Sequence, residues 1–166
     1  MLGLTPRRAP KWQGCGTHSA ATGTTLKRWS GEFFPNGGAR TGTSRWRLAI
    51  GGTIVIDEGH SDGSAGPLDH LLLFWWDKEA NIYRLFVCFK DQASACEVRG
   101  TAHWEGKSLV NDYEETVHGK LTKMKDSFIE ITPSAHTLVA AIDSGNGGMK
   151  TLITTRSVRR RKISGE

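Results

Sequence analysis

Hydrophobic and polar residues alternate along most of this chain with a period of two. The alternation is clearest from Leu72 to Leu109, where two hydrophobic segments are joined by Asp91-Gln92-Ala93 and followed by the turn sequence Trp104-Glu105-Gly106-Lys107. A period of two is typical of β-strands with one buried face, and short turns between such segments predict antiparallel hairpins. No segment shows apolar residues at spacings of three, four and seven, so no helix is predicted. The pattern predicts an all-β protein, either a closed barrel or a sandwich.

Turn sequences divide the chain into about ten or eleven predicted strands, and most of the 20 glycines fall in the turns. The predicted strands cover residues 28–34, 41–50, 53–60, 68–76, 82–90, 94–104, 107–116, 118–124, 127–132, 137–142 and 149–155. A barrel is favoured over an open sheet because closure leaves no strand edge unpaired. Three regions follow: a mobile N-terminal extension at 1–25, a barrel domain at 26–156 and a basic C-terminal tail at 157–166.

The charge distribution places most basic residues at the two ends of the chain. The formal net charge is +5, while the central part is acidic. Basic ends can bind nucleic acid or an anionic surface, but charged termini are more often solvated, and we favour that interpretation. The longest apolar run, Leu71 to Trp76, is far shorter than the ~20 residues of a membrane-spanning helix. The N-terminal sequence has no apolar segment typical of a signal peptide, so a cytoplasmic location is the default expectation.

The cysteines and histidines do not form a recognisable metal or redox motif. Cys88 and Cys96 would face each other if the turn between them were centred on Gln92, and a disulfide is then conceivable. Two reduced, buried thiols are the favoured interpretation, because free cysteine packs as a small apolar side chain. The six histidines show no metal-binding spacing. We therefore expect no metal and no cofactor.

Four short motifs occur in an order and spacing typical of one protein family. They are Trp29-Ser30-Gly31-Glu32, the segment Arg45 to Gly52, the segment Leu72 to Tyr83 and the segment Gly100 to Leu109. Together they resemble a bacterial lipocalin-like family of unassigned function, related to calycin-type barrels. The family usually has glycines near Leu71 to Leu73 and before its tyrosine, which are missing here, and the motif of haem-binding nitrobindins is absent. The resemblance implies an antiparallel lipocalin-like barrel and a small apolar ligand, and it carries over no catalytic residues.

The expected function is non-covalent binding of a small hydrophobic or amphipathic molecule inside the barrel, with aromatic and aliphatic walls and a few polar groups. Six tryptophans suit either a ligand cage or a packed core, and core packing is favoured. Because Trp75 and Trp76 are adjacent, one should face inward and the other outward, where it would make a homodimer credible. The predicted ligand-binding residues are Trp46, Ile54, Ile56, Phe74, Arg84, Phe86, Arg99, His103, Tyr113 and Val139.

The alternative function is an isomerase or cyclase that uses the same cavity as an active site. Acid–base catalysis needs titratable side chains that converge on a substrate. The candidate catalytic residues are His103, Tyr113 and Glu58. Periodicity alone leaves open whether the polar faces that carry Arg84, Arg99 and His103 line the interior or face solvent.

Overall fold

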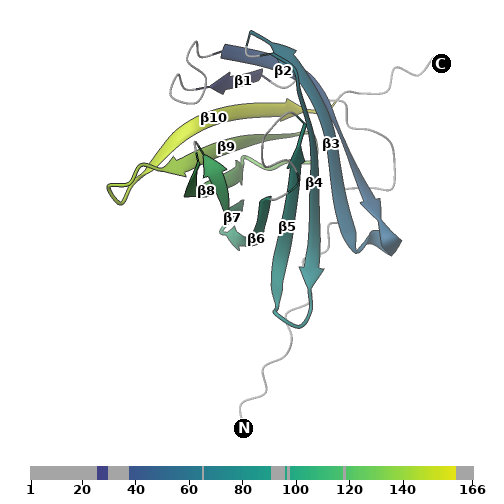
Figure 1. The fold of residues 1–166 in the computed structure, drawn as a ribbon. Coiled ribbons are helices and arrows are strands. Elements are labelled where there is room, and N and C mark those ends of the chain that lie inside the picture. The colour runs from purple at the N-terminus through teal and green to yellow at the C-terminus, as the bar shows by residue number, and fades with distance from the viewer. Residues whose placement is uncertain are drawn as a thin grey trace, which may run out of the picture.

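The computed structural model describes residues 26–29, 38–64, 66–90, 96, 98–117 and 119–159, which form one antiparallel sheet curled into a barrel (Figure 1). The strands are β1 (Leu26–Trp29), β2 (Gly38–Ala49), β3 (Ile54–Gly63), β4 (Leu68–Asp77), β5 (Ile82–Phe89), β6 (Val98–Glu105), β7 (Ser108–Val117), β8 (Lys120–Ile129), β9 (Ala135–Asp143) and β10 (Met149–Val158). Each strand pairs with the next along the chain, and β1 pairs with both β10 and β2, which closes the sheet. The prediction of an all-β antiparallel barrel of about ten strands is confirmed.

One predicted turn is instead the middle of a strand. The sequence predicts two short strands here, 118–124 and 127–132, separated by the polar pair Lys125-Asp126. The structure has a single strand there, β8, which pairs with β7 and with β9 across this segment. The prediction failed because Asp126 points into the barrel, where a polar residue breaks the hydrophobic pattern without breaking the strand.

Other boundaries differ only slightly from the prediction. β6 begins at Val98, whereas residues 91–95 and 97 lie outside the described part of the chain. β1 begins at Leu26, two residues before the first predicted strand, 28–34, and residues 30–34 of that prediction lie outside the described part of the chain. β10 continues to Val158, beyond the predicted barrel boundary at residue 156. The predicted N-terminal extension, 1–25, and residues 160–166 of the predicted tail are outside the described residues.

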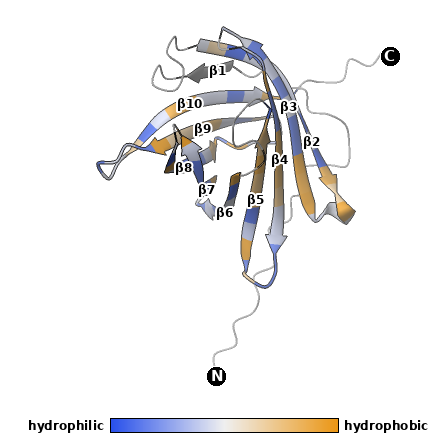
Figure 2. Ribbon diagram, viewed as in Figure 1, coloured by the Kyte–Doolittle hydropathy of each residue, from blue (hydrophilic) through white to orange (hydrophobic). Residues whose placement is uncertain are grey.

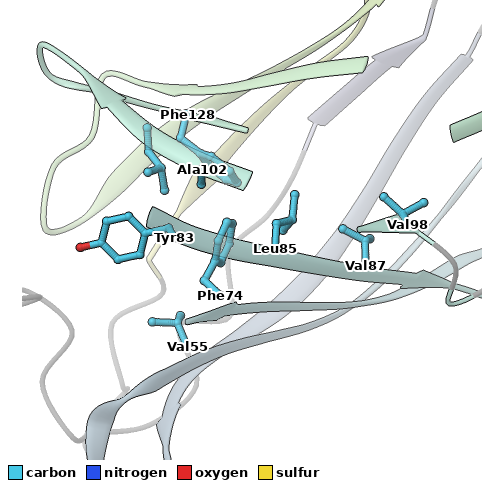
Figure 3. Packing of buried hydrophobic residues seen from close by; sticks show 9 residues of the cluster. Val55, Phe74, Tyr83, Leu85, Val87, Val98, Ala102 and Phe128 are labelled. Atoms are coloured by element: carbon cyan, nitrogen blue, oxygen red, sulfur yellow. The ribbon is translucent and has the colours of Figure 1, made fainter. Parts of the chain in front are cut away.

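The strand register places one set of alternate residues inside the barrel. One cross-strand row runs from Val55 through Phe74, Leu85 and Gly100 to Tyr113. Figure 2 shows the resulting alternation of hydrophobic and hydrophilic bands along the strands. The main core cluster consists of Val55, Phe74, Tyr83, Leu85, Val87, Val98, Ala102, Leu109 and Phe128 (Figure 3). Burial of these side chains, at about 25 cal/mol per Å² of apolar surface, is the main stabilising contribution in such a sheet.

The two adjacent tryptophans of β4 face opposite sides of the sheet, as the alternation predicts. Trp76 packs against Tyr83, with ring centroids 4.7 Å apart. Trp75 is paired with Ile54 and Arg84 on the outer face and is 36% exposed.

Cys88 and Cys96 form a disulfide that closes the β5–β6 connection. The favoured prediction of two reduced thiols is therefore wrong, and the alternative of a bridge between them is correct. The sulfur atoms are 2.09 Å apart and the Cα atoms 3.8 Å apart. The bridge forms because Cys88 lies near the end of β5, where the chain doubles back toward β6.

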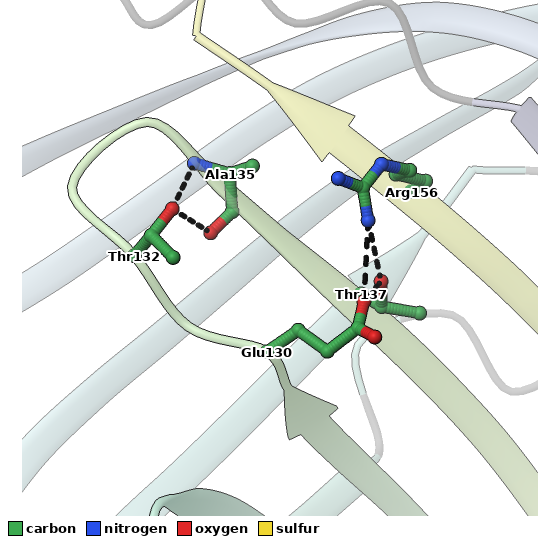
Figure 4. A network of polar contacts seen from close by, with 5 residues as sticks. All are labelled: Glu130, Thr132, Ala135, Thr137 and Arg156. Atoms are coloured by element: carbon green, nitrogen blue, oxygen red, sulfur yellow. Dashed lines mark hydrogen bonds and ion pairs between the residues drawn. The ribbon is translucent and has the colours of Figure 1, made fainter.

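A polar network on the outside of the barrel joins the end of β8 to β9 and β10 (Figure 4). Glu130 Oε2 accepts hydrogen bonds from Thr137 Oγ1 at 2.8 Å and from Arg156 Nη1 at 3.2 Å. Thr132 Oγ1 exchanges hydrogen bonds with the backbone N–H and C=O of Ala135. These contacts fix the β8–β9 turn.

Within the described residues, no helix is long and apolar enough to cross a membrane.

Candidate functional site

Aromatic rings fill the barrel interior close to the turns that contain Gly51 and Thr132. Trp46 on β2 stacks on Phe74 with ring centroids 6.4 Å apart and meets Phe128 edge-on at 6.1 Å. The ring of His136 lies 5.8 Å from Trp46 and 5.5 Å from Phe128. Burial lowers the pKa of His136, with a smaller opposing effect from Asp57, so the ring is held neutral within this aromatic layer. The layer packs this part of the barrel.

A polar cluster occupies the interior wall formed by β7 and β8. Asn111 and Asp126 are direct cross-strand partners, and both belong to the inward-facing set. Tyr113, two residues along β7, donates its hydroxyl to Asp126 Oδ1 at 3.2 Å. Glu115 follows on the same face and interacts electrostatically with Asp126 and Tyr113. We call Asn111, Tyr113, Glu115 and Asp126 the interior polar cluster.

Apolar side chains surround this cluster on the neighbouring strands. Met124, Ile142 and Leu152 form a second buried group, against which Tyr113 and Val117 pack. The wall therefore combines hydrogen-bonding atoms with an apolar surface beside them. An amphipathic molecule presents the same combination.

The Asn111 side chain is the most unusual member of the cluster. It is 1% exposed, and neither Oδ1 nor Nδ2 has a hydrogen-bond partner among the residues that the structure describes. A buried polar group without a partner costs roughly 1–3 kcal/mol. Native proteins rarely keep such a group unless something other than the protein satisfies it.

The electrostatics of Asp126 follow from its enclosure in the barrel. Burial raises the pKa of Asp126 from 3.8 to about 7, the Tyr113 hydrogen bond opposes this rise, and the charge of Glu115 adds to it. Burial also raises the pKa of Glu115. Burial raises the pKa of Tyr113 well above 10, with further contributions from the charges of Asp126 and Glu115, so its hydroxyl stays protonated and donates to Asp126. At neutral pH the cluster thus holds a carboxyl group close to its midpoint of ionisation.

The interior polar cluster is partly accessible. Tyr113, Glu115 and Asp126 each keep part of their surface exposed, whereas Asn111 is 1% exposed.

A glycine positions the tyrosine of the cluster. Gly100 lies opposite Tyr113, and a Cβ atom on it would come within 2.5 Å of the Asp112 carbonyl oxygen and 2.7 Å of Tyr113 Cβ. Real Cβ atoms do not approach other atoms so closely. The absence of a side chain at this position lets Tyr113 lie where its hydroxyl reaches Asp126.

A second inward-facing polar pair lies on β3 and β4. Asp57 Oδ2 and His70 Nε2 are 3.2 Å apart, and Asp57 is 5% exposed. The His70 ring lies directly against Gly59, where a Cβ atom would come within 2.1 Å of the ring. Asp57 Oδ1 has no hydrogen-bond partner within the described residues. The interior is therefore polar at more than one place, although most of its wall is apolar.

A groove of about 780 Å³ runs over the outer face of β2 to β5 and is open to solvent. Three of its charged side chains interact: His60 Nδ1 bonds Asp69 Oδ1, and Lys90 Nζ lies 3.4 Å from Asp69 Oδ2. The hydrogen bond from His60, with help from Lys90, lowers the pKa of Asp69. The Cys88–Cys96 disulfide forms part of the wall. The charges of His60, Asp69 and Lys90 therefore satisfy one another.

The ten predicted ligand-binding residues divide between the two faces of the sheet. Trp46, Phe74 and Tyr113 face inward, and they belong to the aromatic layer and the polar cluster. The other seven alternate with the buried set and lie on the outer face: Ile54, Ile56, Arg84, Phe86, Arg99, His103 and Val139. Arg84 bonds Asp77 Oδ2 there, and the Arg99 guanidinium lies over the ring of Phe86. Periodicity separates the two faces of a strand but does not say which one is inside.

The three candidate catalytic residues do not converge. His103 lies on the outer face of β6, where its ring nitrogens contact Glu105 at 3.0 Å and Asp112 at 3.5 Å. Glu58 is on the outer face of β3 near Arg47, whereas Tyr113 is inside the barrel. No single cavity can contain all three. Within the described residues, no group of three or more histidine, cysteine, aspartate or glutamate side chains could hold a metal ion.

Most of the interior polar residues are not among the predicted site residues. Asp126 falls between two predicted strands, and neither Asn111 nor Glu115 is predicted as a site residue. The signal that could have identified them is a polar residue on an otherwise hydrophobic strand face. Asn111 lies on the same face of its strand as Leu109 and Tyr113, and Asp126 lies on the same face as Met124 and Phe128.

A scan of the chain against protein-family models and a search of curated proteins returned no match.

Proposed function

We propose that this protein binds a small amphipathic molecule non-covalently inside the barrel. The observation that carries the proposal is the Asn111 amide, which is buried and has no hydrogen-bond partner among the described residues. Its direct cross-strand neighbour is Asp126, whose side chain is partly accessible. A bound molecule with hydrogen-bonding atoms at one end would satisfy these groups.

The apolar end of the molecule would lie against the aliphatic wall. Met124, Ile142 and Leu152 provide this surface next to the polar cluster. Burying an alkyl chain against them contributes roughly 25 cal/mol per Å², or about 0.8 kcal/mol per methylene group. The polar cluster would set the orientation of the ligand and contribute specificity. The antiparallel barrel and the order of the sequence motifs support a lipocalin-like container, and we include membership of that kind of family in the proposal.

The first experiment is native mass spectrometry of the full chain purified from its own host, compared with the denatured mass. We expect a retained small-molecule adduct that disappears on denaturation. The adduct should be weaker or absent in Asn111→Leu, which removes the amide and fills space beside Asp126. Asp112→Asn, an exposed substitution at the next position of β7, is the control and should keep the adduct.

A negative result needs a second measurement, because a ligand can be lost during purification. The purified chain is therefore also offered decylamine, decanol and decanoate, and uptake is followed by tryptophan fluorescence and titration calorimetry. An apo mass together with no uptake of any of the three amphiphiles would refute the proposed function.

A further inference from the structure

The interior polar cluster contains acidic groups and no cation. The groups that act on the charge of Asp126 are Tyr113, through a hydrogen bond, and Glu115, through its negative charge. The two carboxyl groups of the cluster, Asp126 and Glu115, act on the pKa of Tyr113, and no basic group does. The inward residues directly beside the cluster are not basic: Gly100 and Ala102 on β6, Met124 and Phe128 on β8, and Leu138, Ala140 and Ile142 on β9. Lys120 has the inward parity at the start of β8, but it is exposed and is not among the groups that act on Asp126.

Three basic or titratable groups that face inward on other strands interact elsewhere, and Lys150, opposite Ile142 on β10, is exposed and is not among the groups that act on Asp126. His70 contacts Asp57 on the β3–β4 wall, and His136 lies in the aromatic layer with its pKa lowered by burial. Arg40 on β2 is influenced by Asp62, with its pKa lowered by burial. None of these three acts electrostatically on Asp126.

The cluster offers a ligand two atoms that accept hydrogen bonds. Asn111 Oδ1 has no donor among the described residues. Tyr113 donates to Asp126 Oδ1, and within the described residues nothing donates to Asp126 Oδ2. A buried carboxylate without a cation loses its hydration without receiving an opposite charge in return. A positively charged N–H donor would supply both the charge and the hydrogen bonds.

We propose that the polar end of the bound molecule is a protonated amine that lies against Asp126 and Asn111, with Glu115 adding its negative charge. This inference rests on the proposed function and specifies its ligand class as an amphipathic amine. The apolar tail of the amine would extend along Met124 and Ile142. The Asn111 amide would accept one N–H of the ammonium group, and the Asp126 carboxylate would accept another.

The net charge of the chain makes this preference a sharp test. At +5 the protein as a whole attracts anions, so non-specific association would favour decanoate over decylamine. Preference for the amine therefore has to come from a local acidic site. Screening by salt weakens surface attraction far more than an interaction inside the barrel.

The experiment compares binding of decylamine, decanol and decanoate to the full chain near neutral pH and at moderate salt. These probes have the same number of carbon atoms, and their head groups are cationic, neutral and anionic, respectively. We expect decylamine to bind about tenfold to a hundredfold more tightly than decanol, the range that a hydrogen bond to a charged group provides. Decanoate should bind most weakly, because its carboxylate would meet two acidic side chains.

Variants then assign the preference to the cluster. Asp126→Asn keeps the shape and the acceptor for Tyr113 but removes the charge, and it should lower decylamine affinity about tenfold or more while leaving decanol affinity unchanged. Glu115→Gln should act in the same direction with a smaller effect, and it serves as the second variant if Asp126→Asn fails to fold. Asp112→Asn, on the outer face of β7, is the matched control and should bind all three probes as the wild type does.

The possible failures are distinguishable. If none of the three probes binds, the proposed interior function is refuted, and the amine preference with it. If decanol or decanoate binds as tightly as decylamine, interior binding stands and the amine inference is overturned. An amine preference that survives in both Asp126→Asn and Glu115→Gln would also overturn it, because the preference would then arise elsewhere.

Discussion

Replacing Asp126 by asparagine should change how the stability of the protein depends on pH. In the folded state burial raises the pKa of Asp126 to about 7, from an ordinary value of 3.8. Between these two pH values the folded state holds a proton that the unfolded state has released. Stability therefore falls as pH rises from about 4 to about 7 and is independent of this group above that range. Asp126→Asn removes this contribution.

The magnitude follows from the difference between the two pKa values. A difference of about 3 units corresponds to roughly 4 kcal/mol, at 1.36 kcal/mol per unit. Part of the Asp126 side chain is accessible, which reduces the penalty, so we expect about 2–4 kcal/mol. This is a large share of the roughly 5–15 kcal/mol that stabilises a typical domain. The asparagine variant should gain this amount relative to wild type between pH 4 and pH 8, because its amide carries no charge and still accepts the Tyr113 hydrogen bond.

The assay is equilibrium unfolding in guanidinium chloride at several pH values from 4 to 8, followed by tryptophan fluorescence. The quantity compared is the free energy of unfolding of Asp126→Asn minus that of the wild type at each pH. Other titrating groups contribute to both proteins and largely cancel in this difference. Asp112→Asn serves as the exposed control and should give a flat difference. A difference for Asp126→Asn that does not rise by at least about 1 kcal/mol across this range would refute the argument, since one pKa unit is worth that much.

Three further predictions test the structure at other points. Phe74→Ala should lower the free energy of unfolding by about 3–5 kcal/mol, whereas Trp75→Ala, on the outer face of the same strand, should cost far less; equal losses in denaturant titrations would contradict the assignment of faces. Removing the disulfide with the double substitution Cys88→Ala and Cys96→Ala should lower stability by about 2 kcal/mol through the entropy of the short loop that it closes, and an unchanged guanidinium midpoint would argue against the bridge. Gly100→Ala should displace the tyrosine of the polar cluster from its aspartate partner, and it should lower the temperature midpoint and reduce the pH effect described above; a variant that matches wild type in both would contradict the close packing.

The architecture of the barrel could be predicted from the sequence because it depends on local information. Strand alternation, glycine turns and hairpin spacing all act over a few residues, and each points to the same antiparallel sheet. The opposite orientations of Trp75 and Trp76 follow from alternation alone.

The identity of the inner face could not be predicted in this way. A strand such as Ile54-Val55-Ile56-Asp57 has apolar residues on both faces, and hydrophobicity ranks Ile54 and Ile56 at least as high as Val55. The inside is decided by register, which here aligns Val55 with Phe74 across the strands. Pairing across five or more strands is non-local, and it places Asp57 inside while the more hydrophobic isoleucines face outward. For this reason seven of the predicted ligand-binding residues lie on the outer face.

The residues that were hardest to predict are also the ones that argue for a function. An aspartate in the middle of a strand interrupts the hydrophobic pattern, and Asp126 therefore falls between two predicted strands. Its position inside the barrel costs free energy through desolvation, as does the buried amide of Asn111. Substitution by apolar residues would relieve both costs, and stability alone would favour such a change. Sequence positions that break the local pattern and lower stability are expected where a protein binds something, because the binding partner supplies the missing interactions. In the function that we propose, the interior polar cluster is such a place. A measured amine preference together with a stabilising Asp126→Asn substitution would show that the same carboxyl group lowers stability and provides specificity.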